Sequence, residues 1–313
     1  MSLAAMPSDL IGIDWGTTHR RARLFDAQGQ VQARHNDDEG MLACQGRFQQ
    51  SLSALLAGWP GATAATPIVM SGMVGGRGGW QEAPYLDNTT SLYALGQHLH
   101  AVAETPAGRS WHIVPGLCWR GFDGEIDVMR GEETQLYGAL HWLGPDKSDG
   151  WYVLPGTHCK WVLLRGGTVR LLRTYLTGEL FASLQARGTL ASAMQRAPSE
   201  QLHTHPAFLQ GIVDQHNRVL SNALFGARAR IATGRLPEED VNAYVSGLLV
   251  GAEWQDFDRM TDDALPIRII GEPALAALHA RCADHFNRDV ELLDADLIQQ
   301  AAWQAFQRER FMA

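Results

Sequence analysis

The sequence has few cysteines, and their spacing lacks the patterns that mark disulfide-bonded domains and zinc sites. Four cysteines occur among 313 residues, far apart and without a CxxC pair: Cys44, Cys118, Cys159 and Cys282. This spacing excludes a disulfide framework and fits a reducing compartment. We therefore expect a cytoplasmic protein.

The sequence also lacks long apolar runs and an excess of basic residues. No apolar run approaches membrane-spanning length, and the first ten residues hold no signal-peptide core, so no membrane partner is expected. The net charge of −8 without a long basic run argues against nucleic acid as a partner. With 45% hydrophobic residues the chain can bury a large core. An anionic substrate would need local arginines and Mg²⁺.

A carboxylate and two hydroxyls follow the first predicted strand. The apolar residues 10–13 lead to Asp14, and residues 21–26 alternate at period two, which predicts a hairpin. The predicted tip holds small and hydroxyl residues, namely Gly16, Thr17 and Thr18. Glycine lets backbone N–H groups approach a phosphate, and Asp14 can hold Mg²⁺ through its water shell. The alternative is an ordinary turn in which these residues bind nothing.

A glycine-rich loop follows the predicted strand 67–70. Residues 71–82 include five glycines, which favours a backbone that lies against a small ligand. The candidate substrate residues here are Ser71, Gly72, Arg77, Trp80 and Glu82. Arg77 would bind a carboxylate, and Glu82 with the backbone would bind hydroxyls. A flexible connector with a stray arginine is the competing interpretation.

Three carboxylates precede or begin a predicted helix over residues 136–143. Asp127, Glu132 and Glu133 could simply stabilise the start of that helix through its dipole. One of them could instead be the general base that takes a proton from an attacking hydroxyl. Residue type leaves both hypotheses open.

The hairpin design returns after a predicted linker at residues 144–150. A strand at 151–154, a Gly-Thr tip and strands at 161–164 and 169–172 repeat the opening pattern, with Gly156-Thr157 140 residues after Gly16-Thr17. The second tip offers Gly156, Thr157, His158 and Lys160, and Leu154 stands where the first has Asp14. The repeat predicts an α/β fold of two domains, 9–145 and 150–313, with a nucleotide between them.

The later part of the chain carries weaker signals. His203 and His205 are one residue apart, and a surface turn is a better interpretation than a metal site. Apolar spacing predicts helices over 209–224, from residue 240, over 274–286 and over 295–311. A strand at 266–270 ends at Gly271, a natural seat for adenosine or its ribose.

Four motifs together resemble the 2-dehydro-3-deoxygalactonokinase family of the sugar kinase, Hsp70 and actin superfamily. They are Ile11-Gly-Ile-Asp-Trp-Gly-Thr-Thr18, Ser71-Gly-Met-Val-Gly-Gly-Arg77, Asp127-Val-Met-Arg-Gly-Glu-Glu-Thr-Gln135 and Leu154-Pro-Gly-Thr-His-Cys-Lys-Trp161. The resemblance implies two ribonuclease-H-like (actin-like ATPase) domains with ATP and Mg²⁺ in the cleft. It also implies phosphorylation of the 6-hydroxyl of 2-dehydro-3-deoxy-D-galactonate, a small sugar acid, in galactonate catabolism.

The resemblance also implies roles for single residues. Asp14, Gly16 and Thr17 match the first phosphate motif, Gly156 and Thr157 match the second, and Gly271 matches the adenosine loop. The general base would be Asp127 or Glu132, and the substrate carboxylate would bind Arg77, with Arg130 or Arg120 in reserve. The second motif lacks the expected acid, which leaves the metal dependent on Asp14 and water.

Two other functions compete with this one. A kinase of another sugar or sugar acid would share the fold, and a chaperone-like or filament-forming ATPase would hydrolyse ATP slowly without a small acceptor. The glycine-arginine loop argues against the second. The sequence does not fix the oligomeric state, and a homodimer is compatible with it.

Overall fold

The computed structural model describes two compact units that interleave along the chain. It describes residues 9–312 apart from 60, 64, 104, 107, 108, 262 and 263, so the first eight residues lie outside the described part. Unit 1 combines Met1–Asp149, Leu163–Leu172 and Ala295–Ala313, and unit 2 combines Gly150–Val162 and Arg173–Asp294. A boundary thus falls within the predicted linker 144–150. The division into two domains with the bounds 9–145 and 150–313 remains a prediction.

Unit 1 is built on a mixed six-stranded sheet in the order β3-β2-β1-β4-β7-β6. Its strands are β1 Leu10–Trp15, β2 Arg20–Phe25, β3 Val31–Asp37, β4 Ile68–Ser71, β6 His100–Ala101 and β7 Trp111–Ile113. The predicted hairpin is confirmed, since β1 and β2 pair antiparallel, whereas β4 runs parallel to β1 and to β7.

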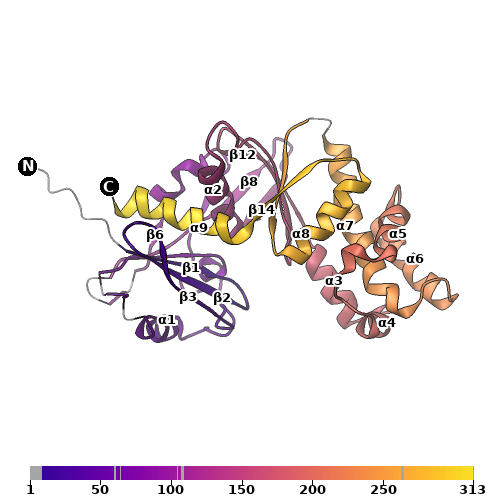
Figure 1. Ribbon diagram of the computed structural model, residues 1–313, viewed down its shortest axis with the longest axis horizontal. Coiled ribbons are helices and arrows are strands. Elements are labelled where there is room, and N and C mark those ends of the chain that lie inside the picture. Colours follow the sequence, from indigo (N-terminus) through magenta and orange to yellow (C-terminus); the bar gives the residue numbers. More distant parts are fainter. Residues whose placement is uncertain are drawn as a thin grey trace, which may run out of the picture. The chain divides into compact units, whose positions relative to one another are not determined.

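Helices cover both faces of this sheet. Successive side chains of a strand point to opposite faces, and here both faces carry apolar residues. Ile11, Ile13 and Trp15 pack with α1, Phe48–Ala57. Leu10 and Val69 belong to a second core cluster with residues of α2, Glu132–Leu143, and α9, Ala295–Phe306. Figure 1 shows the yellow helix α9 beside α2, far apart in sequence. The C-terminal helix therefore completes the core of unit 1.

Unit 2 repeats this topology. Its sheet has the order β12-β11-β10-β13-β14, which corresponds strand by strand to β3-β2-β1-β4-β7. The strands are β10 Gly150–Leu154, β11 Cys159–Arg165, β12 Thr168–Tyr175, β13 Ile267–Gly271 and β14 Val290–Asp294. As in unit 1, the strand that enters the Gly-Thr tip has a parallel neighbour, here β13 beside β10. The predicted duplication is confirmed.

The helices of unit 2 differ from the prediction in two ways, because a short helix at Ala191–Arg196 was not predicted and one predicted helix is interrupted. They are α3 Thr177–Ala186, α4 Ala191–Arg196, α5 Pro206–Gln215, α6 Leu220–Ala232, α7 Val241–Met260 and α8 Pro273–His285. The single helix predicted over 209–224 is wrong, because the chain breaks between α5 and α6, where Asn217 has a φ of +60°. His205 caps α5 by accepting the Ala207 N–H at 3.2 Å, as a residue of a turn would.

A small sheet of unit 1 was not predicted. It has the order β5-β8-β9, with β5 Tyr85–Asp87, β8 Gly116–Arg120 and β9 Ile126–Met129. Ile126 and Val128 are 67% and 40% exposed, so β9 lacks a strong buried face that would mark it in the sequence. Asp127 therefore lies within a strand, and Arg120 pairs with Asp87 at 3.2 Å.

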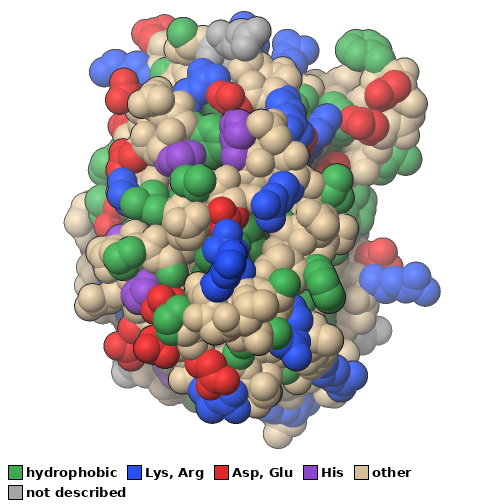
Figure 2. All heavy atoms as spheres, turned by 90° about the vertical axis from the view of Figure 1, so that its right-hand side faces the viewer, with side chains coloured by type: hydrophobic (Ala, Val, Ile, Leu, Met, Phe, Trp, Pro, Cys, Tyr) green, Lys and Arg blue, Asp and Glu red, His purple; other side chains and the backbone are tan. Residues whose placement is uncertain are grey.

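The remaining regular segments are short. They are the 3₁₀ turns Met73–Gly75, Leu92–His98, Leu202–Thr204 and Glu238–Asp240 and the π-helical end Gln307–Phe311. Among the described residues, no helix is long and apolar enough to cross a membrane. Figure 2 shows one face of the molecule, on which basic and acidic side chains are interspersed with neutral and apolar ones.

Candidate active site

The tip of the first hairpin is held from behind by a second segment. The N–H groups of Met41 and Leu42 donate to the carbonyls of Gly16 and Thr17, at 2.8 and 3.1 Å. A Cβ at Gly40 would lie 2.3 Å from the carbonyl carbon of Thr18, so only glycine fits there. Thr17 and Thr18 are exposed. The tip is thus a fixed loop that presents two hydroxyl side chains to solvent.

The tip of the second hairpin is held in the same way. Glu179 N–H donates to the Thr157 carbonyl at 2.9 Å, and a Cβ at Gly178 would lie 2.5 Å from the Gly156 oxygen. Thr157 and His158 are exposed, and His158 Nε2 lies 2.6 Å from Glu179 Oε2. This correspondence of the two tips exceeds what the sequence repeat predicted.

A glycine at the end of the neighbouring strand abuts each tip. A Cβ at Gly72, after β4, would lie 2.9 Å from the Trp15 carbonyl oxygen, and one at Gly271, the end of β13, would lie 2.7 Å from Pro155 Cγ. Gly72 also has a φ of +91°, which other residues rarely adopt. Gly72 and Gly271 therefore occupy equivalent places in the two units.

Lys160 differs from the other residues of the second tip. Its side chain is 6% exposed, and Nζ donates to Thr174 Oγ1 at 2.9 Å. The ammonium is therefore held inside unit 2. Its predicted role in binding phosphate stays a prediction.

Asp14 lies at the base of the first tip. Its side chain is 35% exposed, and Oδ2 lies 3.9 Å from Arg21 Nη1. Burial raises the pKa of Asp14, against the opposing charges of Arg21 and Arg23. Ser71, paired with Asp14 across the strands, has a buried Oγ without a hydrogen-bond partner among the described residues. A partly desolvated carboxylate in this position is suited to bind a hard cation.

The start of α2 lies close to the same strand ends. A Cβ at Gly131 would lie 3.4 Å from the Gly72 Cα, and one at Gly72 would lie 3.4 Å from Asp14 Oδ1. Glu132 and Glu133 follow Gly131 directly. The helix start and Asp14 therefore flank the single residue Gly72.

Both glutamates accept backbone N–H groups of the two residues that precede α2, so each of them is bonded to the chain at the start of that helix. Glu132 Oε2 accepts Arg130 N–H at 3.0 Å, and Glu133 Oε2 accepts Gly131 N–H at 2.7 Å. Glu132 is half-buried, whereas Glu133 is fully buried. Burial, with a smaller contribution from the Glu132 charge, raises the pKa of Glu133 to about 7. Only Glu132 of the two is open to a ligand.

Asp127 has a different setting. It lies in β9, opposite Trp119, and its Oδ1 accepts the Val128 N–H at 2.7 Å. Asp127 thus belongs to the sheet β5-β8-β9, whereas Asp14 and Ser71 belong to the six-stranded sheet.

The candidate side chains of the glycine-rich loop lie in different surroundings. Trp80 packs its ring against Phe48 and Trp111, with centroids 6.1 and 5.5 Å away, so it anchors the loop to the core. Arg77 and Glu82 are exposed, and Arg77 makes no hydrogen bond or ion pair to the described residues. Arg77 is therefore the group in this loop that can bind an anion from solvent.

Arg130 lies beneath the same loop. Its Nη2 donates to the Ala83 carbonyl at 2.8 Å, and its guanidinium lies over the Tyr85 ring at 4.3 Å. Nε and Nη1 are buried without a partner among the described residues. In this position Arg130 supports the loop and holds unused donors close to it.

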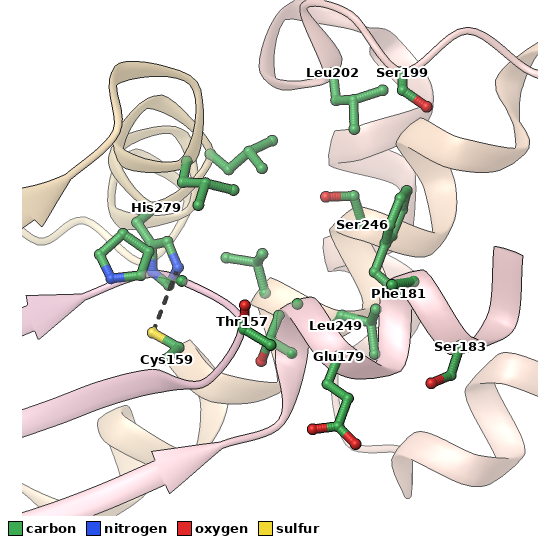
Figure 3. Close-up of a pocket in the computed structure, with 18 of the residues that line it drawn as sticks. Thr157, Cys159, Glu179, Phe181, Ser183, Ser199, Leu202, Ser246, Leu249 and His279 are labelled. Carbon is green, nitrogen blue, oxygen red and sulfur yellow. Dashed lines mark hydrogen bonds between the residues drawn. The ribbon is translucent and has the colours of Figure 1, made fainter. Parts of the chain in front are cut away.

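A cavity of about 680 Å³ opens beside the second tip. Pro155, Gly156 and Thr157 line it from the tip, and most of the other lining residues belong to α3, α7 and α8. Cys159 of β11 and Ser199 and Leu202, which precede α5, complete the lining. Figure 3 shows Phe181, Ser246 and Leu249 on one side of it and His279 on the other. Sequence reasoning missed these residues, because their helical spacing indicates only core packing.

Comparisons with known proteins agree with this geometry. A sequence profile of the 2-keto-3-deoxy-galactonokinase family matches residues 14–305. The 2-dehydro-3-deoxygalactonokinase of Escherichia coli K12 is 33% identical over 298 residues, which cover 95% of this chain and 96% of that protein. The chain belongs to the 2-keto-3-deoxy-galactonokinase family.

Solved structures agree with this assignment. A Sinorhizobium meliloti protein provisionally described as a 2-dehydro-3-deoxygalactonokinase is 30% identical, with a TM-score of 0.89 and coverage of 96% of this chain and 99% of that one. The activator of 2-hydroxyisocaproyl-CoA dehydratase from Clostridium difficile, solved with ADPNP, has a TM-score of 0.53 at 12% identity over 96% of this chain and 95% of its own. The second likeness shows the fold alone.

The predicted fold class and function are confirmed. The fold is α/β with two ribonuclease-H-like units of the actin-like ATPase type. As a member of the 2-keto-3-deoxy-galactonokinase family, the chain is a kinase of 2-dehydro-3-deoxygalactonate. This function is favoured over a kinase of another sugar and over a non-metabolic ATPase.

The buried Glu133 makes the stability of this family member depend on pH. Its pKa is about 7 in the folded protein and 4.5 as the ordinary value, so the folded state binds the extra proton between these values. The free energy of unfolding then falls as pH rises from 4.5 through 7, by at most about 3 kcal/mol. We expect Glu133→Gln to flatten this slope in denaturant melts at pH 5 and pH 8.

The exposed Glu125 offers a matched control. Glu125→Gln should leave the slope as in the wild type. An unchanged slope in Glu133→Gln would show that Glu133 is ionised in the folded protein throughout this range.

Proposed function

We propose that this kinase transfers the terminal phosphoryl group of ATP, with Mg²⁺, to the 6-hydroxyl of 2-dehydro-3-deoxy-D-galactonate in the galactonate pathway of the cytoplasm. The observation that carries the proposal is the pair of matching Gly-Thr tips, each fixed from behind by a glycine segment. Two loops that are held in place from behind and carry exposed hydroxyls suit phosphate oxygens.

The cavity of unit 2 supports a site for adenosine. Its 680 Å³ is in the range of ligand sites, its walls are mainly apolar, and Thr157 of the second tip borders it. A base bound there would have its phosphates at the tip, where Gly156, Thr157 and His158 lie. Gly271 would allow the close approach of β13 to the same tip.

Asp14 fits the requirements of Mg²⁺. Its carboxylate is a hard oxygen ligand at the edge of the first tip, and burial makes its charge costly until a cation is bound. The second tip has Leu154 in the equivalent place and offers no such ligand. Bound Mg²⁺ would neutralise charge on the phosphates, whereas Gly16, Thr17 and Thr18 would position them.

Glu132 is the general base that the geometry favours over Asp127. It follows Gly131, which packs on Gly72 beside Asp14, and it is only half-buried. A carboxylate in that position can accept the proton of the attacking hydroxyl, while Asp127 lies in a separate sheet.

The glycine-rich loop is the proposed site for the sugar acid. Ser71 and Gly72 lie at its start, beside Asp14, and Arg77 offers an exposed guanidinium to the substrate carboxylate. Glu82 would accept hydrogen bonds from hydroxyls, and Arg130 would support the loop from beneath. Trp80 would likewise support the loop, by packing against the core.

Arg77→Ala should raise the KM for the sugar acid about tenfold or more and leave the KM for ATP nearly unchanged, because one charge-assisted hydrogen-bonding group is lost. Steady-state kinetics with each substrate varied in turn measure both constants. Arg235→Ala, at an exposed arginine of unit 2, is the control. A larger effect on the KM for ATP would reassign the loop to the nucleotide.

A coupled assay of ATP consumption across a panel of acceptors tests the proposed function. We expect turnover with 2-dehydro-3-deoxy sugar acids that have a free 6-hydroxyl, and none with 6-deoxy analogues or neutral aldohexoses. Phosphorus NMR of the product identifies the oxygen that is phosphorylated. Equal turnover with simple hexoses, or a phosphate on another oxygen, would overturn the proposal.

A further inference from the structure

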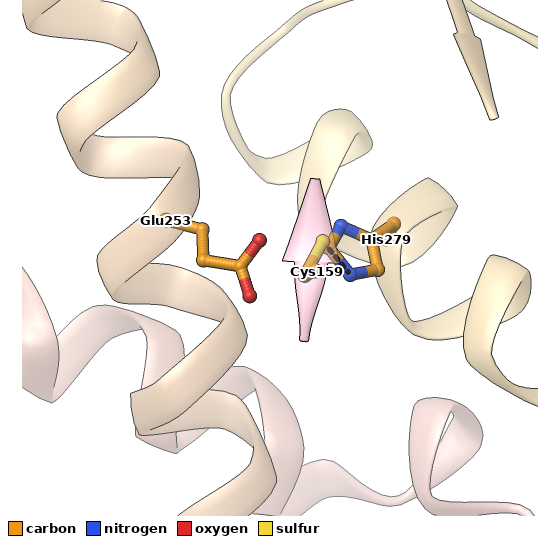
Figure 4. Close-up of side chains that lie close together, drawn as sticks. All are labelled: Cys159, Glu253 and His279. Carbon is orange, nitrogen blue, oxygen red and sulfur yellow. Dashed lines mark hydrogen bonds between the residues drawn. The ribbon is translucent and has the colours of Figure 1, made fainter. Parts of the chain in front are cut away.

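Three side chains with metal-binding atoms meet in the interior of unit 2. Cys159 comes from β11, Glu253 from α7 and His279 from α8, and they are 1%, 1% and 2% exposed. One ligand atom of each lies within 4.8 Å of the other two. Figure 4 shows the Glu253 carboxylate directed toward Cys159 and His279. The three positions are far apart in the sequence, so no metal-binding spacing motif predicts them.

The carboxylate in this cluster has hydrogen bonds but no cation. Trp161 Nε1 donates to Glu253 Oε2 at 2.8 Å, and Thr177 Oγ1 donates to Oε1. Among the described residues no Lys, Arg or His nitrogen pairs with Glu253 within 4.0 Å. A fully buried carboxylate is costly unless a positive charge compensates it. The cluster therefore has the charge of a cation site.

The imidazole of His279 lies beside the thiol of Cys159. His279 is 2% exposed, and the ring nitrogen that faces Cys159 is Nε2. This nitrogen lies 3.8 Å from Cys159 Sγ. In a tetrahedral zinc site, neighbouring sulfur and nitrogen ligands are about 3.6 Å apart. The sulfur–nitrogen pair thus nearly has the separation that zinc requires.

The chemistry and the surroundings of the three ligands favour Zn²⁺ over Mg²⁺. Thiolate, imidazole and carboxylate together suit Zn²⁺, whereas Mg²⁺ takes oxygen ligands. Cys159 and His279 also line the cavity beside the second tip, as Figure 3 shows, so a fourth ligand could enter from there. Three protein ligands with water in the fourth position are an established composition of zinc sites.

We propose that Cys159, Glu253 and His279 bind one Zn²⁺ at the wall of the cavity of unit 2, with a water from the cavity as the fourth ligand. This site is separate from the proposed Mg²⁺ site at Asp14, which lies in unit 1. Where the cavity binds adenosine, as proposed above, zinc there would lower the apparent affinity for ATP, and that consequence alone rests on the proposed function.

Direct metal binding tests the site. The full-length protein is stripped with a chelator, dialysed against Zn²⁺ in excess Mg²⁺, and assayed by plasma mass spectrometry. We expect about one equivalent of zinc in the wild type and less than about a tenth in Cys159→Ser and His279→Gln. The controls Cys118→Ser, a buried cysteine of unit 1, and His203→Ala, a histidine of the Leu202–Thr204 turn, should bind zinc as the wild type does.

A second measurement needs no variant. Cobalt bound to the wild type should show a thiolate-to-cobalt charge-transfer band and the visible absorption of tetrahedral cobalt. Absence of that band, or equal zinc in folded Cys159→Ser and wild type, would overturn the proposal. Titration of ATP with and without Zn²⁺ then separates the two claims: zinc bound with unchanged ATP affinity would count against the adenosine site and leave the zinc site standing.

Discussion

Asp14→Asn is expected to lower kcat by about 10³-fold, because the proposed metal ligand loses its charge and the phosphates lose a neutralising cation. Stability should be unchanged or higher, since burial raises the pKa of Asp14 and the neutral amide avoids that cost. The combination separates a chemical role from a structural one. Kinetics at saturating ATP and sugar acid, with thermal melts of the same samples, measure both.

Asp26→Asn is the matched control for this variant. Asp26 lies at the other end of the same hairpin, where its carboxylate accepts the N–H groups of Gln28 and Gln30 at 2.9 and 2.8 Å. It should keep its activity and at most lose some stability. If Asp14→Asn retained most of its kcat, the metal and phosphate roles of the first tip would both be wrong.

Glu132→Gln is expected to lower kcat about 10²- to 10⁴-fold, because the hydroxyl proton loses its acceptor in the transition state. The amide keeps the hydrogen bond that Arg130 N–H donates, so the start of α2 should remain intact. The acidic limb of the pH–rate profile should disappear with the carboxylate. Rapid-quench measurement of the phosphoryl-transfer step would show whether chemistry is the step that slows.

Asp127→Asn is the discriminating partner of that variant. The structure places Asp127 in the sheet β5-β8-β9, whereas Gly131 packs on Gly72 beside Asp14. It should therefore change kcat only a few-fold. The reverse pattern, a severe loss in Asp127→Asn with a nearly normal Glu132→Gln, would move the general base into β9.

The repeated hairpins could be predicted from sequence because local signals specify them. Alternating apolar residues and Gly-Thr tips act within a few residues, and their repetition predicted the matching topology of the two sheets. The small sheet β5-β8-β9 was missed, since Ile126 and Val128 are exposed and β9 has no clear apolar face. The break between α5 and α6 was missed for a related reason: apolar spacing continues through Asn217, whose left-handed φ ends the helix.

The sequence predicted many of the residues of the candidate site, but not the contacts that hold them in place. Asp14, Thr17 and Thr157 are at strand ends and tips, as their motifs indicate. Gly40 and Gly178 carry no motif, and their role appears only when backbone from elsewhere in the chain lies 2.3 and 2.5 Å from where a Cβ would be. The residues that line the cavity could not be predicted from sequence either. Helical periodicity indicates that a residue is buried, but it does not show whether that residue packs in a core or lines a ligand site.

The place of α9 has a consequence for how the protein is made. Trp303 of this helix fills the space above Gly12 in the first strand, and Asp296 pairs with Arg23 of the second at 2.7 Å. Unit 1 therefore cannot complete its core until α9 has left the ribosome, whereas the segments of unit 2 precede α9 in the chain. Deletion of α9 should thus damage unit 1, most of which is translated first.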